Sequence, residues 1–291
     1  MELAPQQPTA PPAGSRMEPA AARQTQPGEG VRPSVGWGVT HLYYRVDAGR
    51  CPDPGLAGKQ LVAALDAFAA APDHQLLCCT VLGLKADLGV MALGPDLRRH
   101  DALARALGGG MAGNALEPAY SYVSLTETSE YMESVEAARA KVKAEYGDGD
   151  PDELARKLRV AEERLAKYRR DKLHPRLPAR AVLAFYPMSK AREPGANWFK
   201  LPFEERRRLM GGHAKVGRRY HGRVLQLVTG STGLDEHEWG VTLLADDLAA
   251  IKEIVYDMRF DEVTASYGRF GPFLVGLTCA PAELPQQLGL A

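Results

Sequence analysis

The stretch "GWGVTHLYYRVD" at residues 36–47 is where the folded pattern of this chain begins. It is rich in aromatic and β-branched residues, which favour a strand. The Gly-rich run at 108–114 is interpreted as the stop of a later helix. The elements predicted after the first strand are a helix marked by Leu61, Leu65 and Phe68, strands at 74–84 and 86–93, a helix marked by Leu97, Leu103 and Leu107, and a strand at 119–127. This order, β-α-β-β-α-β, is the ferredoxin-like split motif.

The same order recurs from "ARAVLAFYPM" at residues 179–188. The elements predicted after it are a helix at 202–220, strands at 223–230 and 238–245, a helix at 246–260 and a final strand at 272–277. Two such units in one chain are an internal repeat, and their antiparallel sheets pack best face to face. The predicted fold class is therefore α+β, with duplicated ferredoxin-like βαββαβ units forming a dimeric α+β barrel-like fold within one chain.

Segments outside the repeat have a different composition. Residues 1–33 are rich in Pro, Gln and Ala and lack periodicity, which predicts a disordered tail. Residues 129–175 are dense in good helix formers, and "GDGDP" divides them into a helical hairpin with Asp150 as N-cap and Pro151 at the first helical position. The predicted division is a tail at 1–33, an N-terminal half at 34–128, a helical connector at 129–175, a C-terminal half at 176–280 and a short tail at 281–291.

The composition argues against several classes of protein. Lys plus Arg and Asp plus Glu each total 36, so no overall charge favours nucleic acid or an anionic membrane as a partner. The cysteines form neither a CxxC pair nor a disulfide framework, and reduced structural thiols are expected. No apolar run resembles a signal peptide or a membrane span, so we expect a cytoplasmic protein.

A histidine interrupts an apolar helix stripe in "LMGGHAKVGRRYHG" at residues 209–222. Leu209, His213, Val216 and Tyr220 recur at the period of one helix face. His213 is either a core histidine with a hydrogen-bonded ring or an axial ligand to a metal in an apolar pocket, since imidazole is the commonest protein metal ligand. This stretch alone leaves both interpretations open.

Other chemistry-bearing residues gather in the same half of the chain. They are "FYPMSK" at the end of a predicted strand, Gln226 in a later strand, and "MRFDEVTASYG" between the last helix and the last strand. In a split βαββαβ unit these segments can converge on one sheet face and its helix. Each motif alone is weak, but together they are specific.

On these residues the chain resembles the chlorite dismutase-like haem family. The resemblance is strong over residues 181–277, which include "NWFKLPFEERRRLM" and "VTGSTGLDEHEWGVTLLADD", and it is greatest to the coproheme decarboxylase branch. It implies a double ferredoxin-like barrel, commonly a homopentamer. It also implies that hydrogen peroxide drives oxidative decarboxylation of iron coproporphyrin III (coproheme) to haem b through a mono-vinyl intermediate. This reaction is the last step of coproporphyrin-dependent haem synthesis, and transient contact with coproporphyrin ferrochelatase is expected.

The same resemblance assigns roles to individual residues. It makes His213 the proximal iron ligand and Tyr186 the catalytic radical tyrosine. Substrate contacts are implied for Lys172, Lys190, Arg218, Gln226, Arg259 and Thr264. Lys172 stands where many relatives have Arg, which keeps the charge but loses the bidentate fork. Thr264 stands where relatives often have Ser, which keeps the hydroxyl.

Gln226 discriminates between the activities of the family. Chlorite dismutases have a distal Arg at the matching position, whereas the Gln226 amide is neutral. Chlorite chemistry is therefore disfavoured and peroxide-driven decarboxylation is favoured. The alternatives are another enzyme of the family, chlorite dismutase or peroxidase, a haem-binding or transfer protein without turnover, and a plain α+β-barrel scaffold.

Overall fold

The computed structural model of the protein describes residues 33–147 and 149–291. Residues 1–32 of the tail predicted at 1–33 lie outside these ranges. The small elements of the described part are η1 (Ala48–Arg50), β6 (Arg192–Glu193), β7 (Ala196–Asn197), η2 (Trp198–Lys200), η3 (Pro281–Glu283) and α9 (Leu284–Gln287). None of the helices among these residues has both the length and the apolar composition needed to cross a bilayer.

The N-terminal half contains four strands in the spatial order β2-β3-β1-β4, and all of its strand pairs are antiparallel. Three helices cover its outer face, where Leu61, Leu65 and Leu107 are fully buried. The elements are β1 (Val35–Val46), α1 (Pro54–Ala69), β2 (Gln75–Val81), β3 (Leu88–Gly94), α2 (Leu97–Leu107), α3 (Gly110–Ala115) and β4 (Leu116–Glu127). The predicted β-α-β-β-α-β order is thus confirmed for this half.

The Gly-rich run does more than end α2. Gly110 takes a positive φ of 58°, and the chain then forms the extra short helix α3. The side chain of Gln60 on α1 accepts hydrogen bonds from the backbone N–H groups of Met111 (2.9 Å) and Ala112 (3.2 Å), which caps α3. The prediction of a simple helix stop missed this helix, because its cap comes from a residue 51 positions earlier in the chain.

The C-terminal half repeats the arrangement. Its strands follow the order β8-β9-β5-β11, which corresponds strand for strand to β2-β3-β1-β4 of the first half, and β10 pairs with the C-terminal end of β5. The elements are β5 (Val182–Lys190), α6 (Phe203–Arg218), β8 (Val224–Gly230), β9 (Trp239–Ala245), α7 (Leu248–Met258), α8 (Glu262–Tyr267), β10 (Gly268–Phe270) and β11 (Leu274–Cys279). The predicted duplication is confirmed.

The two halves join edge to edge instead of forming two separate sheets that face each other. β4 pairs with β8, β11 pairs with β2, and β5 pairs with β9, so eight strands close into one antiparallel barrel. Closure satisfies backbone groups that free edge strands would leave unpaired. Its interior is filled by large side chains such as Tyr122, Phe185, Met91 and Leu244.

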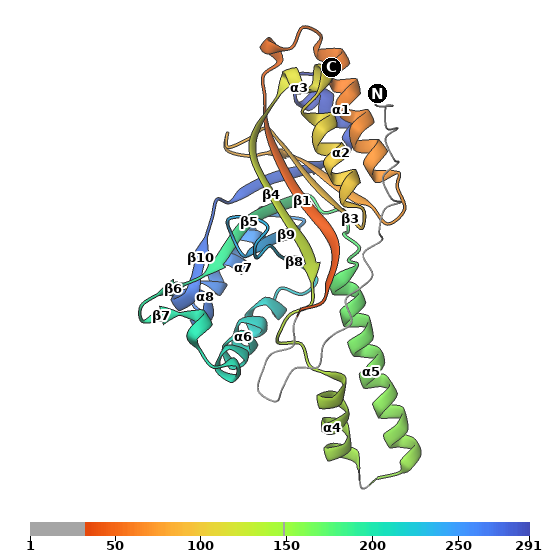
Figure 1. Ribbon diagram of the computed structural model, residues 1–291, viewed down its shortest axis with the longest axis vertical. Helices are drawn as coiled ribbons and strands as arrows, with labels where there is room; N and C mark the ends of the chain where they lie inside the picture. Colours follow the sequence, from red (N-terminus) through yellow and green to blue (C-terminus); the bar gives the residue numbers. More distant parts are fainter. Residues whose placement is uncertain (1–32, 148) are drawn as a thin grey trace, which may run out of the picture.

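The segment between the halves forms the predicted helical hairpin, α4 (Val135–Tyr146) and α5 (Pro151–Leu173). Asp150 caps α5 through a hydrogen bond from the Asp152 N–H, and Pro151 is the first helical residue, as predicted. The hairpin extends away from the barrel, whereas α6, α7 and α8 lie on the outer side of the C-terminal strands (Figure 1).

Candidate functional site

His213 lies late in α6, a helix with Glu204 and Glu205 in its first turn and Lys215 and Arg218 in its last turn, charges that suit the helix dipole. The helix packs against α7 and α8. Leu209, one turn before His213, is buried, while the His213 side chain keeps 27% of its surface exposed. Leu209 is the one buried residue of α6, and the imidazole is accessible.

Asp261 orients this imidazole. Its Oδ2 lies 3.0 Å from His213 Nδ1 and also accepts the Thr264 hydroxyl at 2.8 Å. Its Oδ1 accepts the backbone N–H groups of Val263 and Thr264, both at 3.0 Å, so Asp261 is the N-cap of α8. With Nδ1 donating to the carboxylate, His213 Nε2 carries the free lone pair that a metal requires.

The charge on Asp261 is maintained although its side chain is only 7% exposed. Burial opposes ionisation, but the hydrogen bond from His213 and the bonds from Thr264 outweigh it and hold the pKa of Asp261 below its usual value. A carboxylate bound to the second nitrogen of a metal-ligating histidine raises the basicity of the ligand.

Tyr186 lies on β5, on the outer face of the barrel, whereas its neighbour Phe185 points inward. Its ring stacks on Phe273 at 4.5 Å and meets Phe270 edge-on at 5.8 Å. Burial raises the pKa of the Tyr186 phenol, which is thus neutral at physiological pH and retains its hydrogen atom.

Lys190 is the last residue of the same strand and is buried, with 8% of its surface exposed. Burial lowers its pKa to about 8, and the carboxylates of Asp261 and Glu238 act in the opposite direction. Its Nζ lies 5.1 Å from the centre of the Trp198 ring. Lys190 is therefore a buried cation near the Asp261–His213 pair.

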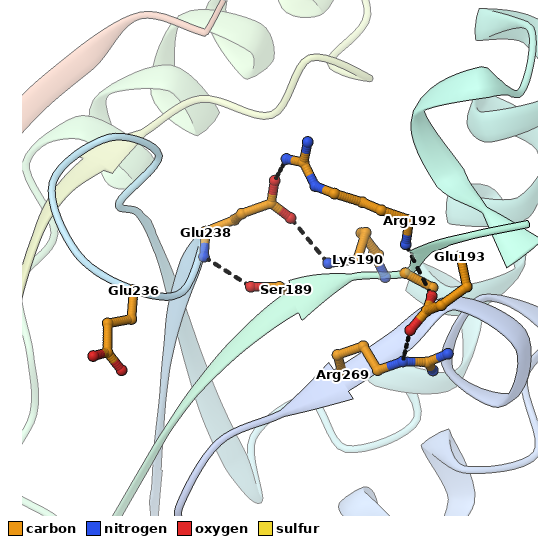
Figure 2. A pocket seen from close by; sticks show the side chains of 8 residues that line it. Ser189, Lys190, Arg192, Glu193, Glu236, Glu238 and Arg269 are labelled. Carbon is orange, nitrogen blue, oxygen red and sulfur yellow. Dashed lines mark hydrogen bonds and ion pairs between the residues drawn. The ribbon is translucent and has the colours of Figure 1, made fainter.

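A charged cavity of about 540 Å³ lies beside Lys190 (Figure 2). Glu238 organises its wall: it accepts the Lys190 backbone N–H at 2.9 Å, forms an ion pair with Arg192, and its own N–H donates to Ser189 Oγ at 3.2 Å. Arg269 on β10 pairs with Glu193 at 3.1 Å. These contacts fix the end of β5 and thereby the position of Lys190.

Gln226 lies half-buried on β8, facing α6. A Cβ added to Gly217, one turn after His213, would lie 3.0 Å from Gln226 Nε2 and 3.2 Å from Met258 Cε. The helix that carries His213 therefore approaches the sheet at Gln226, and the glycine permits that approach.

The remaining predicted site residues are Arg218, Arg259 and Lys172, and no side-chain hydrogen bond or ion pair joins them to His213 among the described residues. Arg218, in the last turn of α6, and Arg259, the C-cap of α7, are exposed, and the Arg259 guanidinium lies over the rings of Tyr256 and Phe260. Lys172 belongs to the last turn of α5, its ammonium lies 5.8 Å from the Tyr168 ring, and burial lowers its pKa. Its contacts connect it to α5 and not to the His213 cluster.

The structure thus brings together His213, Thr264 and Lys190 and adds two residues to which sequence reasoning gave no role, Asp261 and Trp198. Asp261 had a local signal, because Asp three residues before Thr in "DEVT" is a plausible helix N-cap. Its bond to His213 had none.

These residues suit a metal carried by a planar macrocycle. Among the described residues, no group of three or more His, Cys, Asp or Glu could hold a metal ion. A metal on His213 therefore needs its other ligands from elsewhere, as a porphyrin supplies them. The donor set fits this arrangement: an accessible imidazole with an oriented tautomer stands on a helix of the half whose outer sheet face carries Tyr186 and Phe273.

A sequence profile described as chlorite dismutase matches residues 57–279, most of the chain. The chain belongs to the chlorite dismutase family. A relative in Halobacterium salinarum, named as a candidate haem-binding protein, is 39% identical over 260 residues, which are 86% of this chain and 49% of the relative. The chain therefore spans about half the length of that relative.

Solved structures of the family share the fold. A structure described as a haem-binding protein from Thermus thermophilus is 32% identical, with a TM-score of 0.73, over 91% of this chain and 100% of that one. Chlorite dismutase from Candidatus Nitrospira defluvii, solved with imidazole, is 18% identical with a TM-score of 0.64 over 87% of this chain and 95% of that one. The latter likeness shows the fold alone.

Proposed function

We propose that this family member is a coproheme decarboxylase, an oxidoreductase that uses hydrogen peroxide to convert coproheme to haem b through a mono-vinyl intermediate. Each step takes a propionate, one peroxide and one proton to a vinyl group, carbon dioxide and two waters. Coproheme is both the substrate and the redox centre. The observation that carries the proposal is the His213–Asp261 pair on two helices of the same half whose outer sheet face holds Tyr186.

His213 Nε2 would hold the substrate iron from the α6 side. Asp261 keeps the Nδ1 proton in place and makes the imidazole a stronger donor. The Thr264 hydroxyl holds the same carboxylate oxygen. In this arrangement Thr264 acts on the substrate through Asp261.

Tyr186 would supply the hydrogen-atom chemistry. Its phenol gives up one electron and one proton, and the resulting phenoxyl radical takes a hydrogen atom from the β-carbon of a propionate. Loss of carbon dioxide and one further electron leaves the vinyl group. The stacked ring of Phe273 holds the phenol in one orientation and keeps its environment apolar.

Four substrate carboxylates require cationic contacts. Arg218 and Arg259 are exposed at the ends of the two packed helices α6 and α7, where guanidinium groups can bind carboxylates in a bidentate manner. Lys190 and Lys172 are the further cations proposed for this role. The neutral Gln226 near α6 is consistent with a distal side that does not hold chlorite. A cytoplasmic location, a homopentamer and transient contact with coproporphyrin ferrochelatase belong to the same proposal.

The second candidate function is haem binding without turnover, and the names of the relatives in Halobacterium and Thermus favour it. One experiment separates the candidates: the protein is mixed with coproheme, peroxide is added in steps, and the porphyrin is weighed by mass spectrometry. Loss of two carboxyl groups supports decarboxylation. A stable complex of unchanged porphyrin mass supports binding alone. In a separate assay with chlorite, rapid oxygen release would identify a chlorite dismutase.

A further inference from the structure

Trp198 is a redox-active side chain buried next to the His213–Asp261 pair. It is 2% exposed and packs in one cluster with Leu209 and Val263. Leu209 precedes His213 by one helical turn, and Val263 follows Asp261 by two residues. The indole also meets the ring of Tyr267 edge-on at 5.2 Å.

If coproheme reacts with peroxide on His213 as proposed above, Trp198 and Tyr186 compete as electron donors to the peroxide. Reduction of one hydrogen peroxide to two waters takes two electrons and two protons. Tyr186 can give one electron and one proton in a way that leads to decarboxylation. Trp198 can instead supply both electrons: the O–O bond of one peroxide breaks, one oxygen atom is added to the indole, the other leaves as one water, and the substrate stays unchanged.

Lys190 places a positive charge against that indole. Its Nζ lies 5.1 Å from the ring centre, and the side chain is 8% exposed. A cation over the face of an indole stabilises the neutral ring and repels the positive charge that develops when the ring loses an electron. The repulsion is strong because water is largely excluded and the local dielectric constant is low.

Tyr186 experiences no matching repulsion. Its ring stacks on the neutral Phe273, and the cation–π pairs within the described residues do not include Tyr186. The carboxylates of Asp261 and Glu238 act on the Lys190 ammonium and favour its charged form. The aromatic ring over which that ammonium lies is Trp198.

We propose that Lys190 is a positioning residue whose charge protects Trp198 from oxidation and so directs the oxidising equivalents of peroxide to Tyr186. This inference rests on the proposed function for its reaction. Its evidence is the geometry of the Lys190–Trp198 pair.

The test is peptide mapping of Trp198 after peroxide treatment of the coproheme-loaded full chain. The variant Lys190→Met removes the charge at similar length, Lys190→Gln removes it with a polar side chain, and Lys190→Arg keeps it. The two neutral variants should carry about tenfold more oxygenated Trp198 per peroxide than the unmodified protein, whereas Lys190→Arg should stay within about twofold of it.

Equal Trp198 oxidation in the unmodified protein and all three single variants would overturn the inference, as would a Lys190→Arg variant that oxidises like Lys190→Met. Absorption of the bound porphyrin and circular dichroism verify that each variant is folded and loaded. The readout is independent of the proposed function. If the unmodified protein forms no vinyl groups but the neutral variants still oxidise Trp198 more, decarboxylation is wrong and the protective role of Lys190 stands.

Discussion

His213 on α6 and Asp261 at the start of α8 lie 48 residues apart in the chain and are joined by a hydrogen bond of 3.0 Å. The same carboxylate begins α8 and receives the Thr264 hydroxyl. One side chain thus fixes both the local backbone and the tautomer of the imidazole, which couples the fold of this region to metal binding.

The variant Asp261→Asn separates these two roles. Asn is as good an N-cap as Asp, so α8 should keep its start. With Oδ1 in the cap, the amide nitrogen faces His213, and the ring must then place its proton on Nε2, where the iron should bind. Coproheme affinity is expected to fall about 10- to 100-fold in an absorbance titration. Asp257→Asn, which alters a carboxylate that binds Tyr220, is the matched control and should bind normally.

Tyr186→Phe tests the phenol without disturbing its packing. The new ring can still stack on Phe273, so the dissociation constant for coproheme should stay within about twofold. The conversion rate should fall by about tenfold or more, equivalent to at least about 1.4 kcal/mol in the barrier. Tyr256→Phe, at an exposed tyrosine on α7, is the control. Haem b production at the normal rate by Tyr186→Phe would contradict the proposed mechanism.

Lys190 should reduce the stability of the protein at neutral pH. Its pKa is about 8 in the folded state and 10.5 in the unfolded chain, so the unfolded chain binds more protons between these values. The resulting penalty is complete below pH 8 and disappears as the pH rises to 10.5. Lys190→Met should therefore be more stable than the parent at pH 7 by roughly 1 to 3 kcal/mol, with the difference shrinking above pH 8.

Urea unfolding at pH 7 and pH 10 measures this difference. The exposed Lys200→Met serves as the control and should show no such trend. A Lys190→Met protein that is less stable than the parent at pH 7 would show that the charge contributes to folding.

His41 should make the barrel sensitive to acid. It is fully buried between strands, stacks on Phe185 at 3.9 Å and bonds Thr242 through Nε2 at 2.9 Å. Burial lowers its pKa to about 3. Between about pH 6.5 and pH 3, His41 is therefore protonated in the unfolded chain and neutral in the folded chain. Stability is lost as the pH falls through this window, by roughly 3 to 5 kcal/mol in total.

His41→Asn removes this titration and should reduce the loss of unfolding free energy between pH 7 and pH 4.5. His100, whose pKa is lowered to about 4 mainly by burial, should account for part of the remainder. The exposed His221→Asn should behave like the parent. An unchanged slope in His41→Asn would place the acid sensitivity elsewhere.

Two glycines of α6 should respond differently to alanine. Nothing lies within 4 Å of a Cβ at Gly211, so Gly211→Ala should gain about 0.5 to 1 kcal/mol from helix propensity. At Gly217 the same gain is offset, because Gln226 and Met258 must move. Gly211→Ala should therefore melt about 2–4 °C above Gly217→Ala by differential scanning calorimetry. Equal melting temperatures would mean that Gln226 and Met258 move away from the new methyl group without loss of stability.

Local patterns in the sequence were sufficient for the element order and the fold class. Strand composition and helix period predicted both βαββαβ units, and the Asp150–Pro151 pair predicted the start of α5. The face that each helix buries is settled by its packing. In α7 the buried face is centred on Ile251, Ile254 and Met258, while Leu248, the first residue of the helix, is half exposed.

The sequence by itself determined which side chains lie on each element, because the periods of 2 and 3.6 residues are local properties of the backbone. Only the tertiary structure decided which elements meet. It closed the barrel through β4–β8 and β2–β11, capped α3 with Gln60, joined Asp261 to His213 and placed Lys190 against Trp198. The physical reason is that these contacts join residues remote in the chain, and packing and hydrogen-bond satisfaction across the whole molecule select their partners.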